Sequence, residues 1–298
     1  MNQSVYTSDK YCFLTKISNF KQKKAIILLL TFSFFLLIPS LGTFAAERST
    51  SPAGIEYLQE NTLYEYDLNQ DGHNETIQYK VAENDDKRTA TIKLYINNKL
   101  YLTKNNNGLS FNIYLLDLNQ SDGHLDLFIH TVWENGGVSD AFFVQYNGSK
   151  LVHSTVFEPE KLTKNIDIYC YTIKKTDGKG GFTIALNTPY TPSIGCYYIE
   201  VSYRLKDGKI TKTTANTYTL SDDSKAYRYK AIKSFTAYQS PGSKKSAYKA
   251  RKGDTVTFDK MYITKTGTVY FRMINSKGKK GFIRSDMENL FRELPAWG

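Results

Sequence analysis

Two segments of the chain carry residue types that bind hard metal ions through oxygen. Residues 67–75 read DLNQDGHNE, and residues 117–126 read DLNQSDGHLD. Oxygen ligands at positions 1, 3, 5 and 9 of a tight loop, with glycine at position 6, can surround a calcium ion. The spacing therefore predicts two candidate calcium sites. Their ligands would be Asp67, Asn69, Asp71, the carbonyl group of His73 and Glu75 in the first loop, and Asp117, Asn119, Asp122 and Asp126 in the second.

A tight turn without a bound ion is the alternative for both loops. Asp, Asn and Gly form such turns without any metal, because their side chains bond to nearby backbone and tolerate positive φ. In the second loop, Ser121 also disturbs the ligand spacing. An EF-hand is excluded, because a strand pattern follows each loop where an EF-hand would continue as a helix. Residues 76–81 alternate with period two, and residues 127–129 are apolar on both faces, as in a buried strand.

The two loops also indicate a repeated architecture. With Ser121 treated as an insertion, they agree at seven of nine positions and are offset by 50 residues. Hairpin signals recur after them at 97–98, 147–148 and 207–208, where Asn, Asp and Gly tolerate a tight turn. We therefore expect an all-β repeat domain with three units, at 62–104, 111–155 and 166–213. The third unit keeps only the turn DGKGG at 177–181.

The first 46 residues have the pattern of a secretory signal peptide. Five lysines precede an apolar run over residues 25–38, and small residues around Ala45 offer a cleavage site. Fourteen helical residues span about 21 Å, less than the roughly 30 Å hydrocarbon core. We expect residues 1–45 to be removed and the protein to be secreted. The alternative is an N-terminal signal anchor in the plasma membrane.

Cysteine content agrees with export. After residue 46 the chain contains two cysteines, Cys170 and Cys196. A disulfide between them would close a loop of roughly 25 residues and stabilise the fold by about 3 kcal/mol in the loop-entropy model. Two free, buried thiols are the alternative.

Charge divides the exported chain into two parts. Residues 47–225 contain 18 Lys/Arg and 23 Asp/Glu, whereas residues 226–298 contain 16 Lys/Arg and 5 Asp/Glu. This change predicts two domains with different partners. The polar stretch at 221–228 would be the linker between a repeat domain at 46–220 and a basic domain at 229–298.

The acidic loops resemble the short calcium-binding loops of FG-GAP or VCBS-type β-propeller repeats. That resemblance rests on the two DLNQ-type loops and implies a calcium-supported adhesion or interaction module. A closed propeller needs at least four blades, and three units are found here. An incomplete propeller-like arrangement and a β-sandwich are both left open.

The C-terminal segment resembles a bacterial SH3 domain of secreted cell-wall proteins. The similar features are a strand followed by an SPG turn over 235–242, the KGD at 252–254 and a late glycine followed by an aromatic residue and Ile283. Phe282 occupies a position where tryptophan is common in that family. Alternating apolar residues predict the core of a small SH3-like barrel, formed by Val256, Phe258, Val269, Phe271, Met273 and Ile283.

The SH3 resemblance implies a groove that binds wall peptides or glycan polymers. Tyrosine suits such a groove because it combines an apolar ring with a polar hydroxyl group. Clustered lysines would attract a polyanion such as teichoic acid, and export argues against nucleic acid. Ordinary domain surface is the alternative for each of these residues. The candidates are Tyr238, Tyr248, Tyr262, Tyr270, Phe282, Lys244, Lys245, Lys279 and Lys280.

Catalysis is weakly indicated. The sequence has no GxSxG, HExxH or phosphate-binding loop. We therefore expect a secreted, non-catalytic binding protein of a Gram-positive cell envelope, with peptidoglycan or teichoic acid as partner and no membrane contact after signal cleavage. One alternative is a carboxylate-based hydrolase, which predicts a pocket containing a carboxyl group of raised pKa. The other is an accessory or inhibitory subunit of a secreted protein, which predicts a large apolar patch.

Overall fold

The computed structural model describes residues 54–84, 89–107, 110–132, 138–159 and 171–296. In these residues the protein is all-β, as the sequence predicts, with antiparallel sheets and a single short helix, α1 (Asp222–Ala226). None of the described sheets closes on itself. The predicted signal peptide at 1–45 and Cys170 lie outside the described residues. Within the part that is described, no helix has the length and apolar character needed to cross a bilayer.

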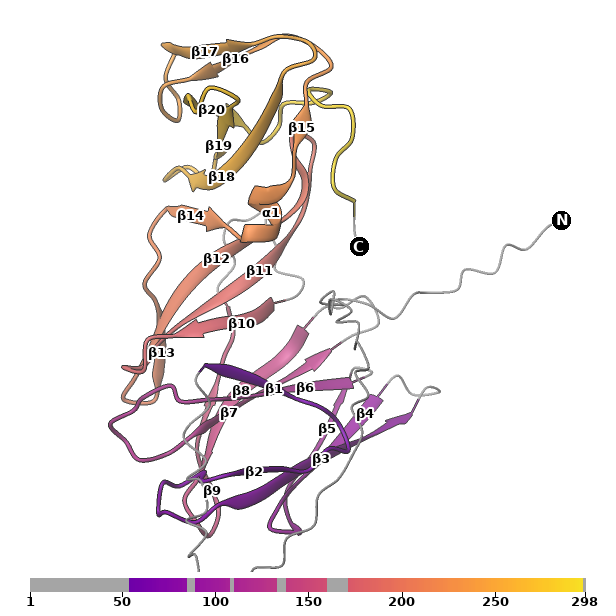
Figure 1. Cartoon of the computed structure of the whole chain (residues 1–298), viewed down its shortest axis with the longest axis vertical. Coiled ribbons are helices and arrows are strands. Elements are labelled where there is room, and N and C mark those ends of the chain that lie inside the picture. Colours follow the sequence, from indigo (N-terminus) through magenta and orange to yellow (C-terminus); the bar gives the residue numbers. More distant parts are fainter. Residues whose placement is uncertain (1–53, 85–88, 108–109, 133–137, 160–170, 297–298) are drawn as a thin grey trace, which may run out of the picture. The chain divides into compact units, whose positions relative to one another are not determined.

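Three consecutive four-stranded meanders make up most of residues 64–212 (Figure 1). In each one, a loop joins the first strand to the second, and the remaining strands follow in chain order through hairpins. The two DLNQ-type loops and the DGKGG turn occupy this same first connection. The strands are β2 (Tyr64–Tyr66), β3 (Glu75–Asn84), β4 (Thr89–Ile96) and β5 (Lys99–Asn107); β6 (Ser110–Leu116), β7 (Asp126–Val132), β8 (Val138–Tyr146) and β9 (Leu151–Val156); and β10 (Tyr171–Thr176), β11 (Gly181–Thr191), β12 (Gly195–Lys206) and β13 (Lys209–Lys212).

The central strands of the second meander, β7 and most of β8, are buried on both faces. Strand β1 (Ile55–Leu58) extends its sheet by pairing with β6. Leu127 and Ile129 belong to a core shared with the first meander, whereas Phe128, between them, belongs to a second core shared with the third meander. The predicted buried strand at 127–129 is thus confirmed, because all three side chains are at most 1% exposed. Burying each such side chain stabilises the fold by about 1.5–3 kcal/mol.

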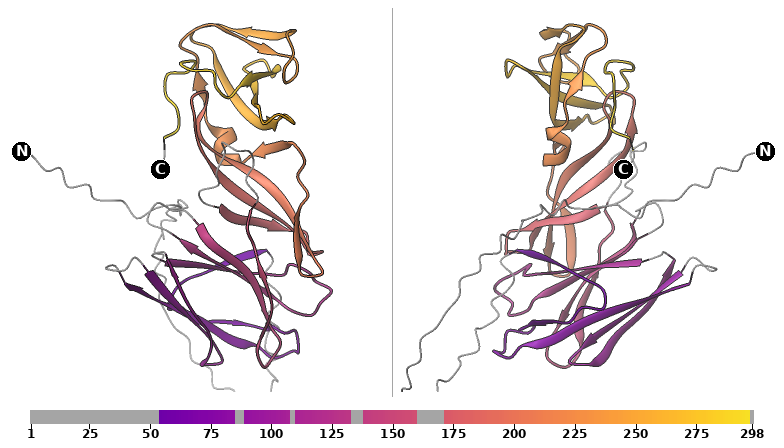
Figure 2. Two further views of the ribbon diagram at one scale, coloured as in Figure 1. Left: turned by 180° about the vertical axis from the view of Figure 1, so that it is seen from behind. Right: turned by 45° about the vertical axis from the view of Figure 1, so that its right-hand side comes forward.

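The C-terminal strands join the third meander through main-chain pairing. Strand β14 (Thr217–Leu220) pairs with β12 on one side and with β18 on the other. Figure 2 shows the long β11 and β12 strands leading toward these C-terminal strands. The residues of the predicted linker at 221–228 include α1, which Ser221 caps by accepting a hydrogen bond from Ser224. The remaining strands are β15 (Tyr229–Lys230), β16 (Phe235–Tyr238), β17 (Ser246–Ala250), β18 (Thr255–Ile263), β19 (Val269–Asn275) and β20 (Lys280–Arg284).

All six predicted core residues of the C-terminal segment are buried, at 8% exposure or less. They alternate along β18, β19 and β20 with half-buried or exposed side chains, which is the period-two pattern of a strand with one face in the core. The aromatic rings of Tyr229 and Phe291 complete this core through edge contacts with Phe258. The pattern therefore identified the buried face correctly.

The C-terminal tail returns to the third meander. The Arg292 N–H donates to the Lys230 carbonyl, and the Cys196 N–H donates to the Pro295 carbonyl at 2.9 Å. Gly195 permits this approach, since a Cβ atom there would lie 2.4 Å from the Pro295 carbonyl oxygen. The tail thus depends on a glycine at the start of β12.

We predict that Gly195→Ala destabilises the protein more than Gly208→Ala. Both glycines have positive φ, 77° and 69°, but Gly208 has no atom within 4 Å of an added Cβ. The strained φ costs about 1–2 kcal/mol at either position, and the contact with Pro295 adds roughly 1–3 kcal/mol at Gly195. Urea unfolding measures both values, and equal losses would contradict the proposed tail contact.

His130 is a buried titratable group in the core between the second and third meanders. Its ring stacks on Tyr114 at 5.7 Å between centroids and lies 5.6 Å from Tyr171. Neither ring nitrogen has a hydrogen-bond partner among the described residues. Burial lowers the pKa of His130 to about 4, so the folded protein keeps it neutral at pH 7.

This burial predicts a specific loss of stability in acid. Below pH 6.5 the unfolded chain protonates this histidine, whereas the folded protein does so only near pH 4. The contribution of the neutral, buried His130 to the free energy of unfolding is therefore complete above pH 6.5, and the free energy of unfolding falls by about 3 kcal/mol toward pH 4. His130→Phe should remove this part of the pH dependence of the free energy of unfolding. The control is His73→Gln, at a side chain that is 89% exposed; equal pH dependence in all three proteins would contradict the assignment.

Candidate functional site

The first acidic loop is organised by hydrogen bonds to its own backbone. The two Asp67 carboxylate oxygens accept from the N–H groups of Asp71 and Gly72, at 3.0 and 2.9 Å. The Asn69 amide donates to Asp71, as does the His73 N–H, and these bonds lower the pKa of Asp71. Gly72 has φ of 92°, which a side chain would strain. The predicted ligands are thus gathered in one turn.

The second loop repeats this arrangement at its ends. Asp126 accepts from the Leu118 N–H at 3.1 Å, as Glu75 accepts from the Leu68 N–H at 2.9 Å. The His124 N–H donates to Asp122, matching the bond from His73 to Asp71. Burial raises the pKa of Glu75 and raises that of Asp126 to about 7. Asp117 is buried at 7% exposure, and Asn119 forms an isolated bridge with Lys179.

The three loops are joined to one another by backbone hydrogen bonds. The Leu125 N–H of the second loop donates to the Leu68 carbonyl of the first at 2.8 Å. The Gly180 N–H of the third turn donates to the Leu118 carbonyl of the second, also at 2.8 Å. The same ends of the three meanders are therefore held together.

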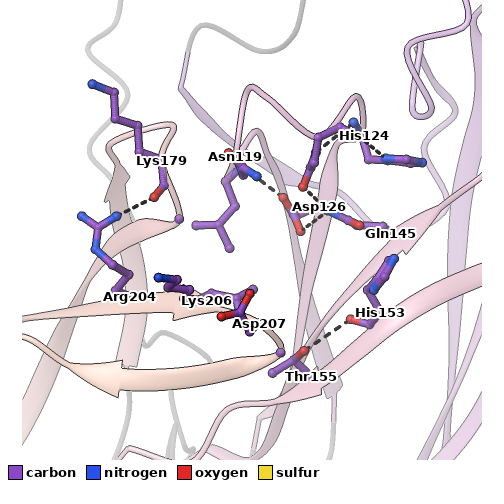
Figure 3. A pocket seen from close by; sticks show the side chains of 15 residues that line it. Asn119, His124, Asp126, Gln145, His153, Thr155, Lys179, Arg204, Lys206 and Asp207 are labelled. Atoms are coloured by element: carbon purple, nitrogen blue, oxygen red, sulfur yellow. Dashed lines mark hydrogen bonds between the residues drawn. The ribbon is translucent and has the colours of Figure 1, made fainter.

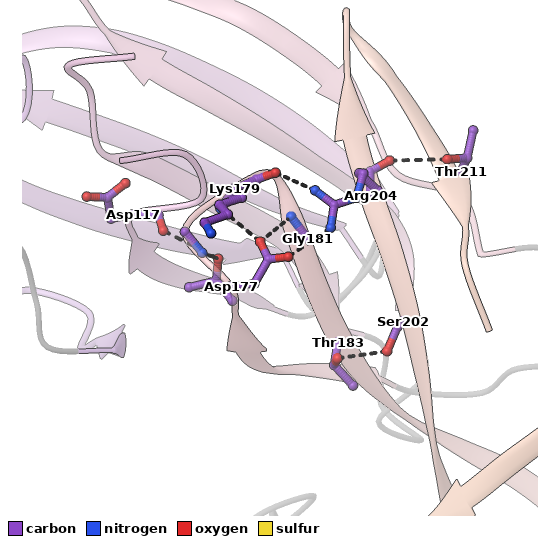
Figure 4. Close-up of polar contacts among 10 residues, drawn as sticks. Asp117, Asp177, Lys179, Gly181, Thr183, Ser202, Arg204 and Thr211 are labelled. Atoms are coloured by element: carbon purple, nitrogen blue, oxygen red, sulfur yellow. Dashed lines mark hydrogen bonds and ion pairs between the residues drawn. The ribbon is translucent and has the colours of Figure 1, made fainter. Parts of the chain in front are cut away.

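In the third meander the first connection is a short turn whose carboxylate forms an ion pair. Asp177 accepts from the Lys179 and Gly181 N–H groups and pairs with Arg204 of β12 at 2.9 Å (Figure 4). Although burial acts to raise the pKa of Asp177, these bonds and the Arg204 charge lower it overall. Arg204 also donates to the Lys179 carbonyl. The Arg204 guanidinium group therefore lies beside the Asp177 carboxylate, where a metal ion would lie in a cation-binding loop.

No group of three or more Asp, Glu, His or Cys side chains among residues 54–296, where described, has the arrangement of a metal site. The carboxylates are instead bonded mainly to backbone N–H groups. Calcium binding by either loop therefore stays a prediction. The acidic positions are nevertheless in equivalent places of the first and second meanders.

A pocket of about 520 Å³ lies beside the second loop (Figure 3). The second loop and β8 form one part of its wall, and the third turn, β9 and the β12–β13 hairpin form the rest. Leu118 and Leu205 supply apolar lining. The polar lining includes Asn119, Asp122, Asp126, Gln145, Thr155, Lys206 and Asp207.

Gln145 links the two carboxylates of this pocket. Its amide nitrogen donates to Asp122 at 3.0 Å and to Asp126 at 3.1 Å. Gln145 is opposite Asp126 in the β7–β8 ladder, which places it there. Sequence reasoning missed this residue because the chain gives no sign that β8 would set a glutamine against the loop.

The C-terminal strands bring four of the five predicted aromatic residues onto one face. Tyr262 is directly opposite Tyr270, and Tyr238 is directly opposite Phe282. Phe282 is also opposite Arg272, two residues beyond Tyr270 on the same side of β19. We call Tyr238, Tyr262, Tyr270 and Phe282 the aromatic face. Each is half-buried or exposed.

Tyr248 is placed differently. It is opposite the buried Ala237 in the β16–β17 pair, and its ring lies against Gly281 in the interior. Its exposure is 9%, and burial raises the pKa of its hydroxyl group. Tyr248 therefore contributes to the core and is not part of the aromatic face.

The four predicted lysines border the aromatic face. Lys244 and Lys245 lie in the turn after Tyr238, Lys279 lies in the turn before β20, and Lys280 is the first residue of β20; all four are exposed. A Cβ atom on Gly242 would lie 3.9 Å from the Tyr270 hydroxyl group, so the first turn reaches this ring. Arg272 and Arg284, on the same face, pair with Asp259 and Asp286.

Cys196 is half-buried on β12, and burial raises the pKa of its thiol. Its proposed partner, Cys170, is outside the described residues, so the disulfide stays a prediction.

Comparison with known proteins gives no match to a family model, to a curated protein or to a solved structure.

Proposed function

We propose that this is a secreted, non-catalytic binding protein of a Gram-positive cell envelope, which binds a wall polymer through the aromatic face. The observation that carries the proposal is the gathering of four aromatic side chains on one accessible sheet face. Tyrosine and phenylalanine rings offer broad apolar surfaces for sugar rings or peptide side chains, and tyrosine adds a hydrogen-bonding tip. The resemblance to bacterial SH3 domains supports the same choice of ligand.

The four lysines at the border would add attraction to an anionic polymer. Arg272 and Arg284 are already paired with carboxylates, so these exposed lysines supply positive charge around the face, together with the half-buried Lys260, which is directly opposite Arg272. Exposed charges of this kind act over a Debye length of about 8 Å at physiological salt. Teichoic acid would therefore be bound in a salt-dependent way, and peptidoglycan chiefly through the rings.

We predict that the chain from residue 46 onward co-sediments with purified Gram-positive sacculi. Tyr270→Ala combined with Phe282→Ala should weaken this binding about tenfold or more, because interface aromatic residues commonly contribute 1–2 kcal/mol each. The control is Tyr190→Ala, at a tyrosine that is 49% exposed on β11, outside the aromatic face. Binding that survives the double substitution would contradict the proposal.

Sacculi stripped of teichoic acid separate the two wall polymers. If the interaction is electrostatic, binding should fall on stripping and in Lys244→Gln/Lys245→Gln. The pair Lys93→Gln/Lys150→Gln, at exposed lysines of the first two meanders, should have no effect. Binding retained on stripped sacculi would instead identify peptidoglycan as the ligand.

Calcium support of the first two meanders is the second part of the proposal. It rests on the equivalent acidic loops and on their resemblance to FG-GAP or VCBS repeats. A bound ion would neutralise the clustered carboxylates, including the buried Glu75 and Asp126. It would thereby fix the ends of the meanders that the hydrogen bonds between the loops already bring together.

We expect millimolar calcium to raise the melting temperature of residues 46–298 by several degrees. A ligand at 100 times its dissociation constant adds about 2.7 kcal/mol, and 1 kcal/mol corresponds to about 2–4 °C at this chain length. Asp67→Asn with Asp71→Asn should remove most of the shift, whereas Asp223→Asn on α1 should leave it unchanged. No calcium-dependent shift in the unsubstituted protein would exclude a physiological calcium site.

A carboxylate-based hydrolase is the second candidate, since the pocket contains Asp126 with a raised pKa. Two carboxyl groups flanking a scissile bond are the requirement for that chemistry. The Gln145 amide, however, fills the position between Asp122 and Asp126. Release of soluble sugar from the same sacculi, lost in Asp126→Asn, would favour the hydrolase over the binding protein.

A further inference from the structure

The pocket beside the second loop differs in charge from the aromatic face. Its lining contains three cationic and three anionic side chains: Lys179, Arg204 and Lys206, and Asp122, Asp126 and Asp207. Two further effects on this charge oppose each other. Burial favours the neutral form of Asp126, which reduces the negative charge, and Asp177 pairs with Arg204, which offsets one positive charge. The pocket is therefore close to neutral within a basic protein, and it offers no net attraction to a polyanion.

The residues that line the pocket supply both hydrogen-bond donors and hydrogen-bond acceptors. Asn119 and Thr155 each provide groups of both kinds, next to the carboxylates and ammonium groups already named, whereas the amide nitrogen of Gln145 is already bonded to Asp122 and Asp126 and only its carbonyl oxygen is left to accept. A sugar hydroxyl group also donates and accepts at once, so a ring with several hydroxyl groups would match such a lining. The half-buried Leu205 offers apolar contact for the C–H groups of the ring.

Two of the polar side chains that line the pocket are held in place before any ligand arrives. Gln145 is fixed by two carboxylates, and Arg204 by Asp177 and the Lys179 carbonyl. The Gly180 N–H ties the third turn to the second loop. Little ordering is then needed on binding, which removes one of the main costs of recognition. The volume of about 520 Å³ is also within the range of small-ligand pockets, about 300–1,000 Å³.

We infer that this pocket binds a neutral saccharide of one or two rings, through Asn119, Gln145, Thr155 and the balanced charges around them. Figure 3 shows the polar side chains of the second loop and β8 on one side of the space, with the third turn and the β12–β13 hairpin across from them. This site lies on different strands from the aromatic face and is independent of the proposed wall binding.

The test is isothermal titration of residues 46–298 with glucose, galactose, mannose, N-acetylglucosamine and its β-1,4-linked disaccharide, at millimolar concentrations. At least one of these neutral sugars should bind, and glucosamine and glucuronate should bind more weakly. Thr155→Trp, which places a large ring at the pocket, should weaken binding roughly tenfold or more. Thr103→Trp, at an exposed threonine on the edge strand β5, should leave it unchanged.

A second pair of substitutions removes a positive charge without adding a larger side chain. Lys206→Gln should weaken saccharide binding several-fold, and Lys209→Gln, just outside the pocket, should not. Absence of binding by every neutral sugar, equal binding by Thr155→Trp, or preference for a charged analogue would each overturn the inference. Loss of sacculus binding in the Tyr270/Phe282 variant with sugar binding intact would show that the two sites are separate.

Discussion

Burial of the central strands of the second meander on both faces is the constraint on which the rest of the structure depends. Leu127 and Ile129 point into one core and Phe128 points into the other, so the strand β7 cannot shift by one residue without exchanging them. The first and third meanders are thereby fixed on opposite faces of one sheet. His130 lies in the second of these cores and, because burial keeps it neutral at pH 7, it makes the packing sensitive to acid.

The layered packing of the three meanders also brings their first connections next to each other. Each meander places its first connection at an equivalent position, and the Leu68 and Leu118 carbonyls accept bonds from the next loop along the chain. Where the third loop has been shortened, Arg204 supplies the cation that an acidic turn needs. The pocket lies between this short turn, the second loop and the β12–β13 hairpin.

The protein thus offers two chemically different surfaces. The aromatic face has lysines at its border and accessible rings in its centre, which suits an extended polymer. The pocket is partly open to solvent, nearly neutral and rich in paired polar groups, which suits a small uncharged ligand. A protein with both could hold a wall polymer while recognising a sugar unit, and because they lie on different strands each can be tested without disturbing the other.

The sequence by itself determined the all-β class, the buried strand at 127–129 and the six core residues of the C-terminal segment, because period-two patterns report directly which face of a strand is buried. It also placed Tyr238, Tyr262, Tyr270 and Phe282 among the candidates. Only the tertiary structure separated Tyr248 from them, because the β16–β17 register turns that ring inward. The pocket likewise required the tertiary structure: Gln145, Arg204 and Thr155 come from three different strands, and no local pattern can show that separate strands bring their side chains to one place.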